Sequence, residues 1–343
     1  MNGQWSFIRE CKSHMKHTVF AVVGCGLIGC KRIAALPPGS ILKYVIDIVP
    51  ANAQRAALLV DYPVTIAATL ESILADKSVD VILIATTHHE LVPIALQAVQ
   101  SGHHVLIEKP GGMCLNDIVR LRSAMDLADV VVHVGYNHRF HPSLREAKAI
   151  IDSNRFGGLL WMRGRYGHGG RLGYEKEWRA NRSNSGGGEL VDQGSHLIDI
   201  CSHLSGEMKL VFSETQNSFW DTDVEDNVFF ALRPKMGGFA WMHASWTEWK
   251  NMFSFEITLE KAKIDISGLG GSYGVETLTL YEMQPEMGPP PSSTMTWEES
   301  DASWTLEIED LVAHINDPGH IPKGTTLDGA IAVWEIIEKA YRK

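Results

Sequence analysis

The sequence feature that most constrains the fold is a short apolar segment that runs into three spaced glycines. Thr18–Val23 is apolar and β-branched, as a buried strand should be, and Gly24-Cys25-Gly26-Leu27-Ile28-Gly29 follows it directly. Leu27–Leu36 then carries apolar residues at helical spacing, and Pro37, Pro38 and Gly39 end that helix. A strand, a glycine turn and a helix in this order predict a dinucleotide-binding turn.

Each residue of this turn has its own expected role. Gly24 permits the tight turn, Gly26 lets a pyrophosphate approach the backbone, and Gly29 lets the helix pack closely on the strand. The start of the helix, with Leu27 and Ile28, offers unpaired N–H groups and a partial positive charge to the phosphates. The motif taken alone would also fit a structural turn that binds nothing, but its position between a strand and a helix favours a cofactor site.

The first 136 residues alternate strand-like and helix-like segments. Further apolar strands are predicted at Ile41–Ile46, Val79–Ala85, His104–Ile107 and Val130–Val134, and helices at Ala51–Val60, Leu91–Gln100 and Asn116–Ala128. Strands that alternate with helices imply right-handed βαβ crossovers and a doubly wound parallel sheet. Residues 17–136 are therefore predicted to form an α/β Rossmann domain, and residues 1–16 a poorly ordered leader.

The pattern changes after about Tyr136. Helices are predicted near Ser143–Ser153, Glu189–Leu204, Trp304–Asn316 and Leu327–Tyr341, and strands at Leu159–Tyr166, Val224–Leu232, Gly238–Trp246, Phe253–Glu260 and Glu276–Glu282. The strands lack βαβ spacing, so residues 137–343 are predicted to form a second α/β domain with a large open, mainly antiparallel sheet. Gly288–Ser293, with three prolines, is predicted to be an exposed loop.

An open sheet of this kind raises the question of what covers it. Its predicted strands carry the large apolar residues Phe239, Trp241, Trp246 and Phe255. Apolar surface of that size has to be covered by helices or by another subunit. We therefore expect a homodimer or homotetramer that assembles through the C-terminal sheet.

The end of the second predicted strand indicates which dinucleotide binds. Asp47 stands there, close to the position expected for an acid that contacts the adenosine ribose. A carboxylate at this place accepts hydrogen bonds from the 2′-hydroxyl and repels a 2′-phosphate. NAD is therefore the predicted cofactor, and NADP is the alternative.

Two later segments carry candidate catalytic groups. Glu108-Lys109-Pro110 follows the fifth predicted strand, at the carboxyl edge of the sheet where ligands bind, and a lysine there can donate to a substrate oxygen. On a helix, Asp192, His196 and Asp199 would share one face. A carboxylate beside an imidazole supports its protonated form and fixes its tautomer, which suits a general base. A buried, purely structural histidine is the competing interpretation.

The chain resembles the glucose–fructose oxidoreductase/inositol dehydrogenase/rhizopine-catabolism (Gfo/Idh/MocA) family over about residues 17–343. The resemblance is carried by the glycine motif, Glu108-Lys109-Pro110, Gly135-Tyr136-Asn137-His138-Arg139-Phe140-His141-Pro142, Trp178-Arg179, and Gly186-Gly187-Gly188 with the Asp192-to-Asp199 stretch. It implies a Rossmann domain followed by a sheet domain that often forms oligomer interfaces. It also implies Lys109, Asp192 and His196 as the catalytic group. Glu108, Asn137, Trp178 and Arg179 would lie near the cofactor.

A basic, glycine-rich stretch from Arg163 to Arg182 precedes the predicted catalytic helix. It contains five arginines besides Lys176 and His168, against Glu175 and Glu177, in a chain whose formal charge is −10. Arginine forks suit phosphate or carboxylate groups, so Arg165 and Arg171 are predicted to bind an anionic part of the substrate, as a nucleotide sugar would have. A solvated basic loop paired with surface acids is the alternative.

Charge and cysteine usage exclude several classes of protein. The charge of −10 argues against nucleic-acid binding and against binding to anionic membranes, and no apolar run approaches the length of a membrane span. Five cysteines without a CxxC pair indicate neither a disulfide framework nor a zinc site, and the pairs His88-His89 and His103-His104 lack partner ligands. No metal site is predicted, and a cytoplasmic location is expected.

These features together predict an enzyme that acts on a CH–OH group. The predicted reaction is hydride transfer between NAD and a secondary alcohol of a sugar or polyol, with Lys109 and His196 acting on the hydroxyl. Two alternatives use the same fold. One is an NAD-dependent glycosidase that works through transient oxidation, and the other is a non-catalytic NAD-binding regulator.

Overall fold

The computed structural model describes residues 17–342, so the predicted leader at residues 1–16 lies outside the described residues. The first domain is built on a seven-stranded sheet in the order β15-β6-β5-β4-β1-β2-β3. Its strands are β1 (Val19–Val23), β2 (Ile41–Ile46), β3 (Thr65–Ile66), β4 (Val81–Ile84), β5 (His104–Glu108), β6 (Val132–Gly135) and β15 (Thr325–Thr326). All neighbouring strands run parallel except β15, which pairs antiparallel with β6.

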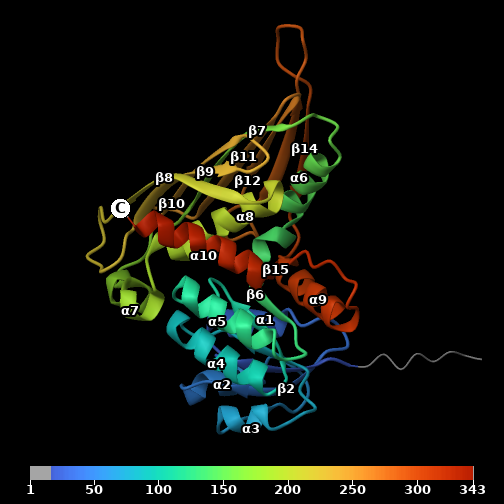
Figure 1. The fold of residues 1–343 in the computed structure, drawn as a ribbon, viewed down its shortest axis with the longest axis vertical. Helices are drawn as coiled ribbons and strands as arrows, with labels where there is room; N and C mark the ends of the chain where they lie inside the picture. Colours follow the sequence, from blue (N-terminus) through green and yellow to red (C-terminus); the bar gives the residue numbers. More distant parts are fainter. Residues whose placement is uncertain (1–16, 343) are drawn as a thin grey trace, which may run out of the picture.

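Helices cover both faces of this sheet, as the continuous apolar strands require (Figure 1). They are α1 (Leu27–Ala34), α2 (Pro50–Ala57), α3 (Leu70–Leu74), α4 (His88–Gln100) and α5 (Leu115–Met125), joined by α9 (Ser303–Asn316) from the far end of the chain. Ile308 and Leu311 of α9 belong to the same core as Phe20 and Val22 of β1. The last part of the chain therefore returns to the nucleotide-binding sheet.

The second domain is built on an eight-stranded sheet in the order β14-β13-β12-β11-β7-β10-β9-β8. The strands are β7 (Leu159–Gly167), β8 (Met208–Gln216), β9 (Asn227–Pro234), β10 (Phe239–Ser245), β11 (Met252–Leu259), β12 (Ala262–Ser267), β13 (Glu276–Glu282) and β14 (Ser292–Trp297). Only β7 and β10 pair in parallel; the other described pairings are antiparallel. The predicted fold class, a Rossmann domain followed by a mainly antiparallel sheet, is confirmed.

One face of the second sheet is covered by α6 (Pro142–Asp152), α8 (Ser195–Ser205) and α10 (Leu327–Tyr341), and no helix of residues 17–342 covers the other face (Figure 1). Burial alternates strictly along β11, as expected for a sheet covered on one side. Short elements complete the chain. η1 (Asn137–Phe140) lies between β6 and α6, and η2 (Tyr174–Lys176), η3 (Trp178–Ala180), α7 (Arg182–Ser185) and the π-helix η4 (Leu190–Gly194) lie between β7 and α8.

Two local predictions were wrong. The helix expected at Glu189–Leu204 is divided into the π-helix η4 and the α-helix α8. The end of the expected exposed loop at Gly288–Ser293 enters β14, because β13 offers it a free edge to pair with. Of the four apolar residues expected to be covered by helices or by another subunit, Trp246 and Phe255 are fully buried within this chain, since Phe255 faces the helices and Trp246 packs with Tyr174 and Val224.

Within residues 17–342, no helix combines the length and the apolar character needed to cross a membrane.

Candidate active site

The glycine turn has the shape that a dinucleotide needs. Gly24 has a φ of +89°, and a side chain there would lie 2.5 Å from the carbonyl oxygen of Ala85. A side chain at Gly29 would collide with the Gly24 carbonyl, so α1 packs on β1 only because this residue is glycine. At Gly26, by contrast, a Cβ would meet no described atom within 4 Å. The space at Gly26 and the start of α1 at Leu27 and Ile28 together fit a pyrophosphate.

Asp47 lies directly beside this turn. One carboxylate oxygen accepts a hydrogen bond from the Cys25 N–H at 2.7 Å, and the other accepts one from the Val49 N–H at 2.7 Å. The neighbouring Ile48 is almost fully exposed and apolar. A carboxylate fixed at the rim of the turn, followed by apolar residues, suits an unphosphorylated ribose better than a 2′-phosphate.

Lys109 and Asp192 meet between the two domains, although 83 positions separate them. Lys109 follows β5, and its Nζ forms a close ion pair with Asp192 Oδ1 and donates to the Asp192 carbonyl at 3.1 Å. Arg179 of η3 approaches the other carboxylate oxygen, with Nε 3.4 Å from Oδ2. Burial alone would raise the pKa of the Asp192 carboxyl, but Lys109 and Arg179 hold that pKa well below its usual value. Asp192 therefore stays ionised and fixes the Lys109 ammonium.

His196 lies on α8 but does not pair with Asp192 as predicted. The π-helical turn from Leu190 to Gly194 shifts the register between the two residues, and Asp192 turns toward Lys109 instead. Burial, and then the charge of Lys109, lower the pKa of His196 well below 6.5. The imidazole is therefore neutral, not protonated, and among the described atoms its Nδ1 has no hydrogen-bond partner.

A second histidine, His138, stacks on His196. The ring centroids are 3.8 Å apart and the planes differ by 14°. His138 is held at both nitrogens, by Asn137 Oδ1 at 3.2 Å and by the Tyr166 hydroxyl at 3.1 Å. Asn137 in turn donates to Ser303 Oγ of α9 at 2.7 Å. The contacts from Ser303 through Asn137 to His138 hold the His138 ring in place, and the stacked His138 ring fixes the plane of the His196 ring.

Trp178 joins the site through His88. The two rings meet edge to face at 4.8 Å, and the Arg179 guanidinium lies 4.4 Å from the centroid of the Trp178 ring. His88 Nδ1 bonds the carbonyl of Ser185 at 2.8 Å. Burial, helped by the positive charge of Lys109, lowers the pKa of His88 to about 3, so this ring is also neutral.

Glu108 points away from the catalytic group. Its carboxylate accepts from Arg32 Nε at 2.6 Å, and Arg32 Nη1 donates to Glu307 of α9, also at 2.6 Å. Arg32 and Glu307 are completely buried, and Trp304 lies against the guanidinium. Burial, only partly offset by Arg32, raises the pKa of Glu307 to about 7. Glu108 is thus part of a buried charge cluster that ties α1, β5 and α9 together.

The arginines predicted to bind an anionic substrate are not gathered at the site. Arg165 projects from β7 on the side opposite to its neighbour Tyr166, which faces the catalytic histidines. Arg171 is largely exposed and pairs with Glu177 at 2.6 Å. Asp199 takes no part either, because it forms two hydrogen bonds with Arg139.

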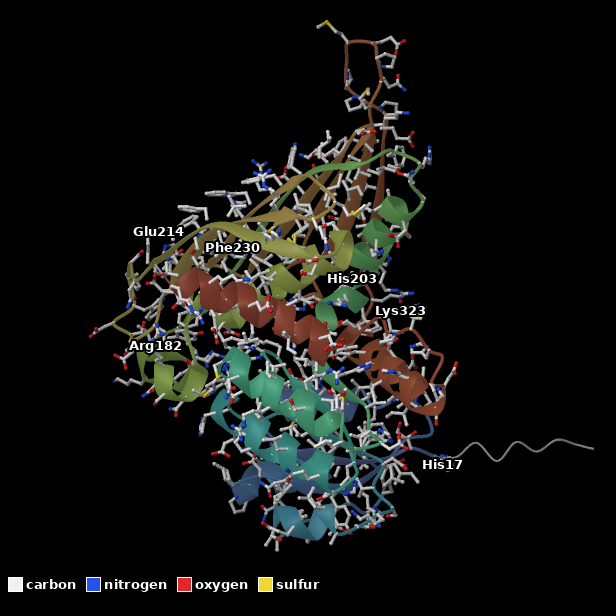
Figure 2. The ribbon with its side chains drawn as sticks, in the orientation of Figure 1. His17, Arg182, His203, Glu214, Phe230 and Lys323 are labelled. Atoms are coloured by element: carbon white, nitrogen blue, oxygen red, sulfur yellow. The ribbon has the colours of Figure 1, made fainter. Side chains whose placement is uncertain are left out.

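Of the predicted residues, the structure brings together Lys109, Asp192, Arg179 and Trp178, with His196 four positions after Asp192; Asp47 lies beside the glycine turn, and Asn137 is buried against His138 and Ser303. Sequence reasoning missed His88, His138 and Tyr166 as members of the site. The first two follow parallel strands at the carboxyl edge of the sheet, and that position was the available signal. Tyr166 lies within β7 of the second sheet, so its position in the sequence does not indicate a role in the site. Figure 2 shows Arg182 on α7, and its guanidinium lies over the Tyr341 ring of α10.

Within residues 17–342, no group of three or more histidine, cysteine, aspartate or glutamate side chains is arranged to hold a metal ion.

Two family models match this chain. One, described as an oxidoreductase family with an NAD-binding Rossmann fold, matches residues 18–136. The other, described as the GFO/IDH/MocA C-terminal domain, matches residues 144–265. The chain belongs to the GFO/IDH/MocA family. Its first domain is the NAD-binding Rossmann domain of that family, so the predictions of the family, of the fold and of NAD as cofactor are confirmed.

Several relatives are named as sugar or polyol oxidoreductases, and one, of Mediterraneibacter gnavus, is named 2,7-anhydro-N-acetylneuraminate hydratase and is 25% identical over 79% of this chain and 75% of that protein. Levoglucosan dehydrogenase of Pseudarthrobacter phenanthrenivorans is 31% identical over 142 residues, which cover 41% of this chain but only 36% of that protein. 1,5-Anhydro-D-fructose reductase of Ensifer adhaerens is 25% identical over 272 residues, 78% of each chain.

Solved structures agree in fold over nearly the whole chain. Levoglucosan dehydrogenase in complex with NADH and levoglucosan superposes with a TM-score of 0.83 over 95% of this chain and 98% of that one, at 21% identity. GenD2 from gentamicin A biosynthesis, in complex with NAD, has a TM-score of 0.81 over 100% and 96% of the two chains, at 22% identity. At these identities the likeness shows a shared fold.

Proposed function

We propose that this protein is an NAD-dependent dehydrogenase that oxidises, or in reverse forms, a secondary alcohol of a sugar or polyol. The observation that carries the proposal is the meeting of the Lys109 ammonium, the Asp192 carboxylate and the neutral His196 ring between the two domains. The named activities of the relatives, on levoglucosan, xylose and scyllo-inositol, support the same class of substrate.

NAD, when bound, supplies the hydride acceptor, and the residues of this chain handle the hydroxyl proton and the charge on oxygen. Lys109 donates a hydrogen bond to the substrate oxygen and stabilises the alkoxide as it develops. His196 is neutral at physiological pH, so it can accept the hydroxyl proton. Asp192 keeps the Lys109 ammonium in place through their ion pair. Asp47 and the glycine turn hold the adenosine and phosphate end of the cofactor.

The arginine contacts support an uncharged substrate rather than a nucleotide sugar. Arg163 donates to the Glu256 carboxylate through Nε and Nη2, Arg171 pairs with Glu177, and Arg179 pairs with Asp192. An anionic substrate would have to compete with these carboxylates. We therefore propose a neutral sugar or polyol as the substrate, which revises the prediction of an anionic group.

A substrate panel tests the proposal. The purified protein is incubated with NAD⁺ or NADP⁺ and with free sugars, polyols, uronic acids, sugar phosphates and nucleotide sugars, while the absorbance of the reduced cofactor and the release of products are followed. We expect reduction of NAD⁺ with a neutral sugar or polyol. Tight NAD binding without any turnover would favour a regulator, and release of an aglycone without net reduction would favour a glycosidase.

We propose further that the protein assembles as a homodimer or homotetramer through the uncovered face of its second sheet. Leu160, Val211, Phe212 and Trp241 are 40–50% exposed, and the Phe212 and Trp241 rings stack at 5.8 Å on that face. Covering such a patch is favourable in water. Light scattering at micromolar concentration tests this, and a monomeric mass would contradict it.

The cysteines support a reducing location. Cys25, Cys30, Cys114 and Cys201 are free thiols, and two of them are fully buried. Proteins of oxidising compartments usually pair their cysteines. We therefore propose a cytoplasmic protein, which fractionation of the source cells would test.

A further inference from the structure

An aromatic wall, made of Tyr174, Trp246, Trp220, Phe219 and Trp249, runs from the end of β7 to the protein surface. It begins at Tyr174, five positions before Arg179, the residue that pairs with Asp192. Tyr174 packs edge to face on Trp246 at 5.0 Å and lies 5.7 Å from Trp220. His168 meets the Tyr174 ring edge to face at 5.6 Å, and Tyr166, two residues earlier at the end of β7, meets the His196 ring at 6.0 Å, so the end of β7 joins this wall to the catalytic histidines.

The outer end of this wall is exposed to solvent. Phe219 meets Trp220 at 5.2 Å and Trp249 at 4.7 Å, edge to face in both cases. Phe219 is 62% exposed and Trp249 is 61% exposed, although large aromatic side chains are normally mostly buried. Two large rings are therefore presented to solvent beside buried aromatic neighbours.

The backbone is strained to present Trp249 in this way. Its φ is +56°, in the left-handed region that bulky residues rarely adopt. Strain of this kind persists where surrounding structure enforces it, and it concentrates at ligand sites. Here the neighbouring loop enforces it: the Glu248 N–H donates to the carbonyl of His168, and a side chain at Gly169 would lie 2.7 Å from the Cα of Trp249.

The Gly167-His168-Gly169-Gly170 segment does not contribute to the catalytic group. Gly169 and Gly170 are required because the segment packs closely against Trp220 and Trp249. Gly170 has a φ of +66°, and a side chain there would lie 2.5 Å from the Trp220 ring. Gly169 makes the same kind of close approach to Trp249. His168 Nδ1 accepts from the Gly170 N–H at 2.9 Å and fixes the bend. The segment is built to bring the loop against the two tryptophans.

A polar cavity of about 270 Å³ lies next to this wall. It is lined by residues 175–177 and 180–181, which follow Tyr174, and by residues 221–223, which follow Trp220. Its lining includes four carboxylates, from Glu175, Glu177, Asp221 and Asp223, against one lysine. Carboxylates accept hydrogen bonds from sugar hydroxyls but repel phosphates. Apolar rings beside hydrogen-bond acceptors form the usual composition of a pocket for an uncharged polar ligand.

We propose that Phe219, Trp220 and Trp249, with the adjoining polar cavity, form a subsite for a second ring linked to the sugar that is oxidised. The substrate class is then a neutral glycoside, not a free monosaccharide and not a nucleotide sugar. The ring offers a flat, C–H-rich or aromatic face to Trp249, and either a second sugar or an aromatic aglycone supplies such a face. This inference rests on the proposed dehydrogenase function.

The test compares substrates that differ only in the second ring. The sugar of highest turnover is assayed as the free sugar and, in both anomers, as its methyl glycoside, phenyl glycoside and disaccharide. We expect kcat/KM for the phenyl glycoside or the disaccharide to exceed that for the methyl glycoside by roughly fivefold or more, the size of one good ring contact. Trp249→Ala should bring this ratio of kcat/KM values close to one, mainly by raising the KM for the phenyl glycoside or the disaccharide. A higher kcat/KM for the disaccharide indicates that the subsite binds a second sugar. A higher kcat/KM for the phenyl glycoside indicates that it binds an aromatic aglycone.

Two further variants separate binding from folding. Trp249→Gly relieves the positive φ, so it should keep the wild-type melting temperature and still lose the preference for glycosides. Tyr62→Ala removes an exposed aromatic ring of the first domain, between α2 and β3 and outside both the subsite and the proposed subunit contact, and should keep the wild-type ratio. The subsite is wrong if the wild type and Trp249→Ala show equal ratios, or if Trp249→Ala changes the mass in light scattering, which would make the patch a subunit contact.

The subsite and the dehydrogenase function fail in different ways. If the wild type oxidises no sugar, the proposed function fails, and the same glycosides are titrated against tryptophan fluorescence in the NADH-bound protein. Saturable quenching by the phenyl glycoside or the disaccharide that Trp249→Ala removes would still support the subsite. Absence of such quenching would overturn it.

Discussion

Glu108 and Lys109 are neighbours in the chain, yet they belong to two charge clusters of opposite composition. Glu108 shares the buried guanidinium of Arg32 with Glu307, so two carboxylates surround one cation. Lys109 shares the Asp192 carboxylate with Arg179, so two cations surround one carboxylate. The first cluster is nearly sealed, whereas the side chains of the second are 13–31% exposed.

This difference in exposure indicates different roles for the two clusters: the sealed one stabilises the fold, and the open one is available to a substrate. The sealed cluster joins three elements, one of which carries the glycine turn, and substrate does not reach it. The open cluster offers positive charge at a surface that a ligand can reach, where an alkoxide would develop. One strand end therefore serves both purposes, because successive residues leave it in opposite directions. Removing a charge from the sealed cluster should affect stability, and removing one from the open cluster should affect turnover.

The largest effect is expected at Arg32. Arg32→Met leaves Glu108 and Glu307 buried without their cation, and breaking a buried pair in this way costs about 3–5 kcal/mol of unfolding free energy. Denaturant unfolding measures the change. Arg155→Met is the matched control, because Arg155 pairs with Glu282 on the surface and should cost less than about 1 kcal/mol. Equal losses of unfolding free energy at the two arginines would show that the buried Arg32 cluster stabilises the fold no more than a surface pair does.

Glu307 should make the stability of the protein depend on pH. Its native pKa is raised from 4.5 to about 7, so between these values the native carboxyl holds a proton that the unfolded chain has released. Unfolding free energy should therefore fall as the pH rises from about 4.5 to about 7, by at most about 3 kcal/mol. Glu307→Gln should lack that component. The measurement is denaturant unfolding across this pH range, and identical slopes for both proteins would show that Glu307 is ionised throughout.

Lys109→Met tests the open cluster. Turnover should fall by roughly 10²-fold or more, because the developing alkoxide loses its positive partner, while NAD binding stays near the wild-type value. His196→Ala should have a similar effect through loss of the base. Steady-state kinetics and calorimetric titration with NAD measure the two quantities. Lys148→Met, at a surface pair with Asp152, is the control. A Lys109 variant with more than half of the wild-type turnover would remove this lysine from the mechanism.

The two clusters also show how far the sequence could predict this molecule. The Rossmann strands and the glycine turn were predictable because every determinant is local: apolar runs, spaced glycines and a helix start. The meeting of Lys109 with Asp192 followed only from the family resemblance, since 83 positions separate the two residues. Glu108 was expected near the cofactor, but its partners Arg32 and Glu307 are 76 and 199 positions away, and nothing local indicates them.

The register of the catalytic helix could not be predicted for a different reason. An α-helix places Asp192 and His196 on one face, and that geometry led to the expected pairing. The π-helical turn at Leu190–Gly194 inserts an offset that the side-chain pattern does not reveal. In the same way, the strand alternation that places Arg165 on the outer face depends on which side the helices cover. Charge composition alone suggested an anion site that the contacts do not support.

A smaller effect is expected at Asp47, whose carboxylate accepts only from neutral donors: two backbone N–H groups and the Asn52 amide. Asp47→Ala should narrow the preference for NAD(H) over NADP(H) by about tenfold, because both the ribose hydrogen bonds and the repulsion of a 2′-phosphate are lost. Calorimetric titration with the two cofactors measures this preference. Tighter binding of NADP(H) by the wild type would show that Asp47 does not face the ribose.

The smallest change in stability and activity is expected for Arg171, which is more exposed than the other residues changed in these predictions. Its side chain is 72% exposed and pairs with Glu177, so the pair should contribute less than about 1 kcal/mol to stability. Because no anionic group is expected on the substrate, Arg171→Ala should also leave kcat/KM for neutral sugars within about twofold of the wild-type value. Kinetics with a neutral sugar and with its phosphate or uronic acid decide the matter. A selective loss of tenfold or more for the charged substrate would restore the anion site at this loop, since one charge-assisted hydrogen bond contributes roughly 1.5–3 kcal/mol.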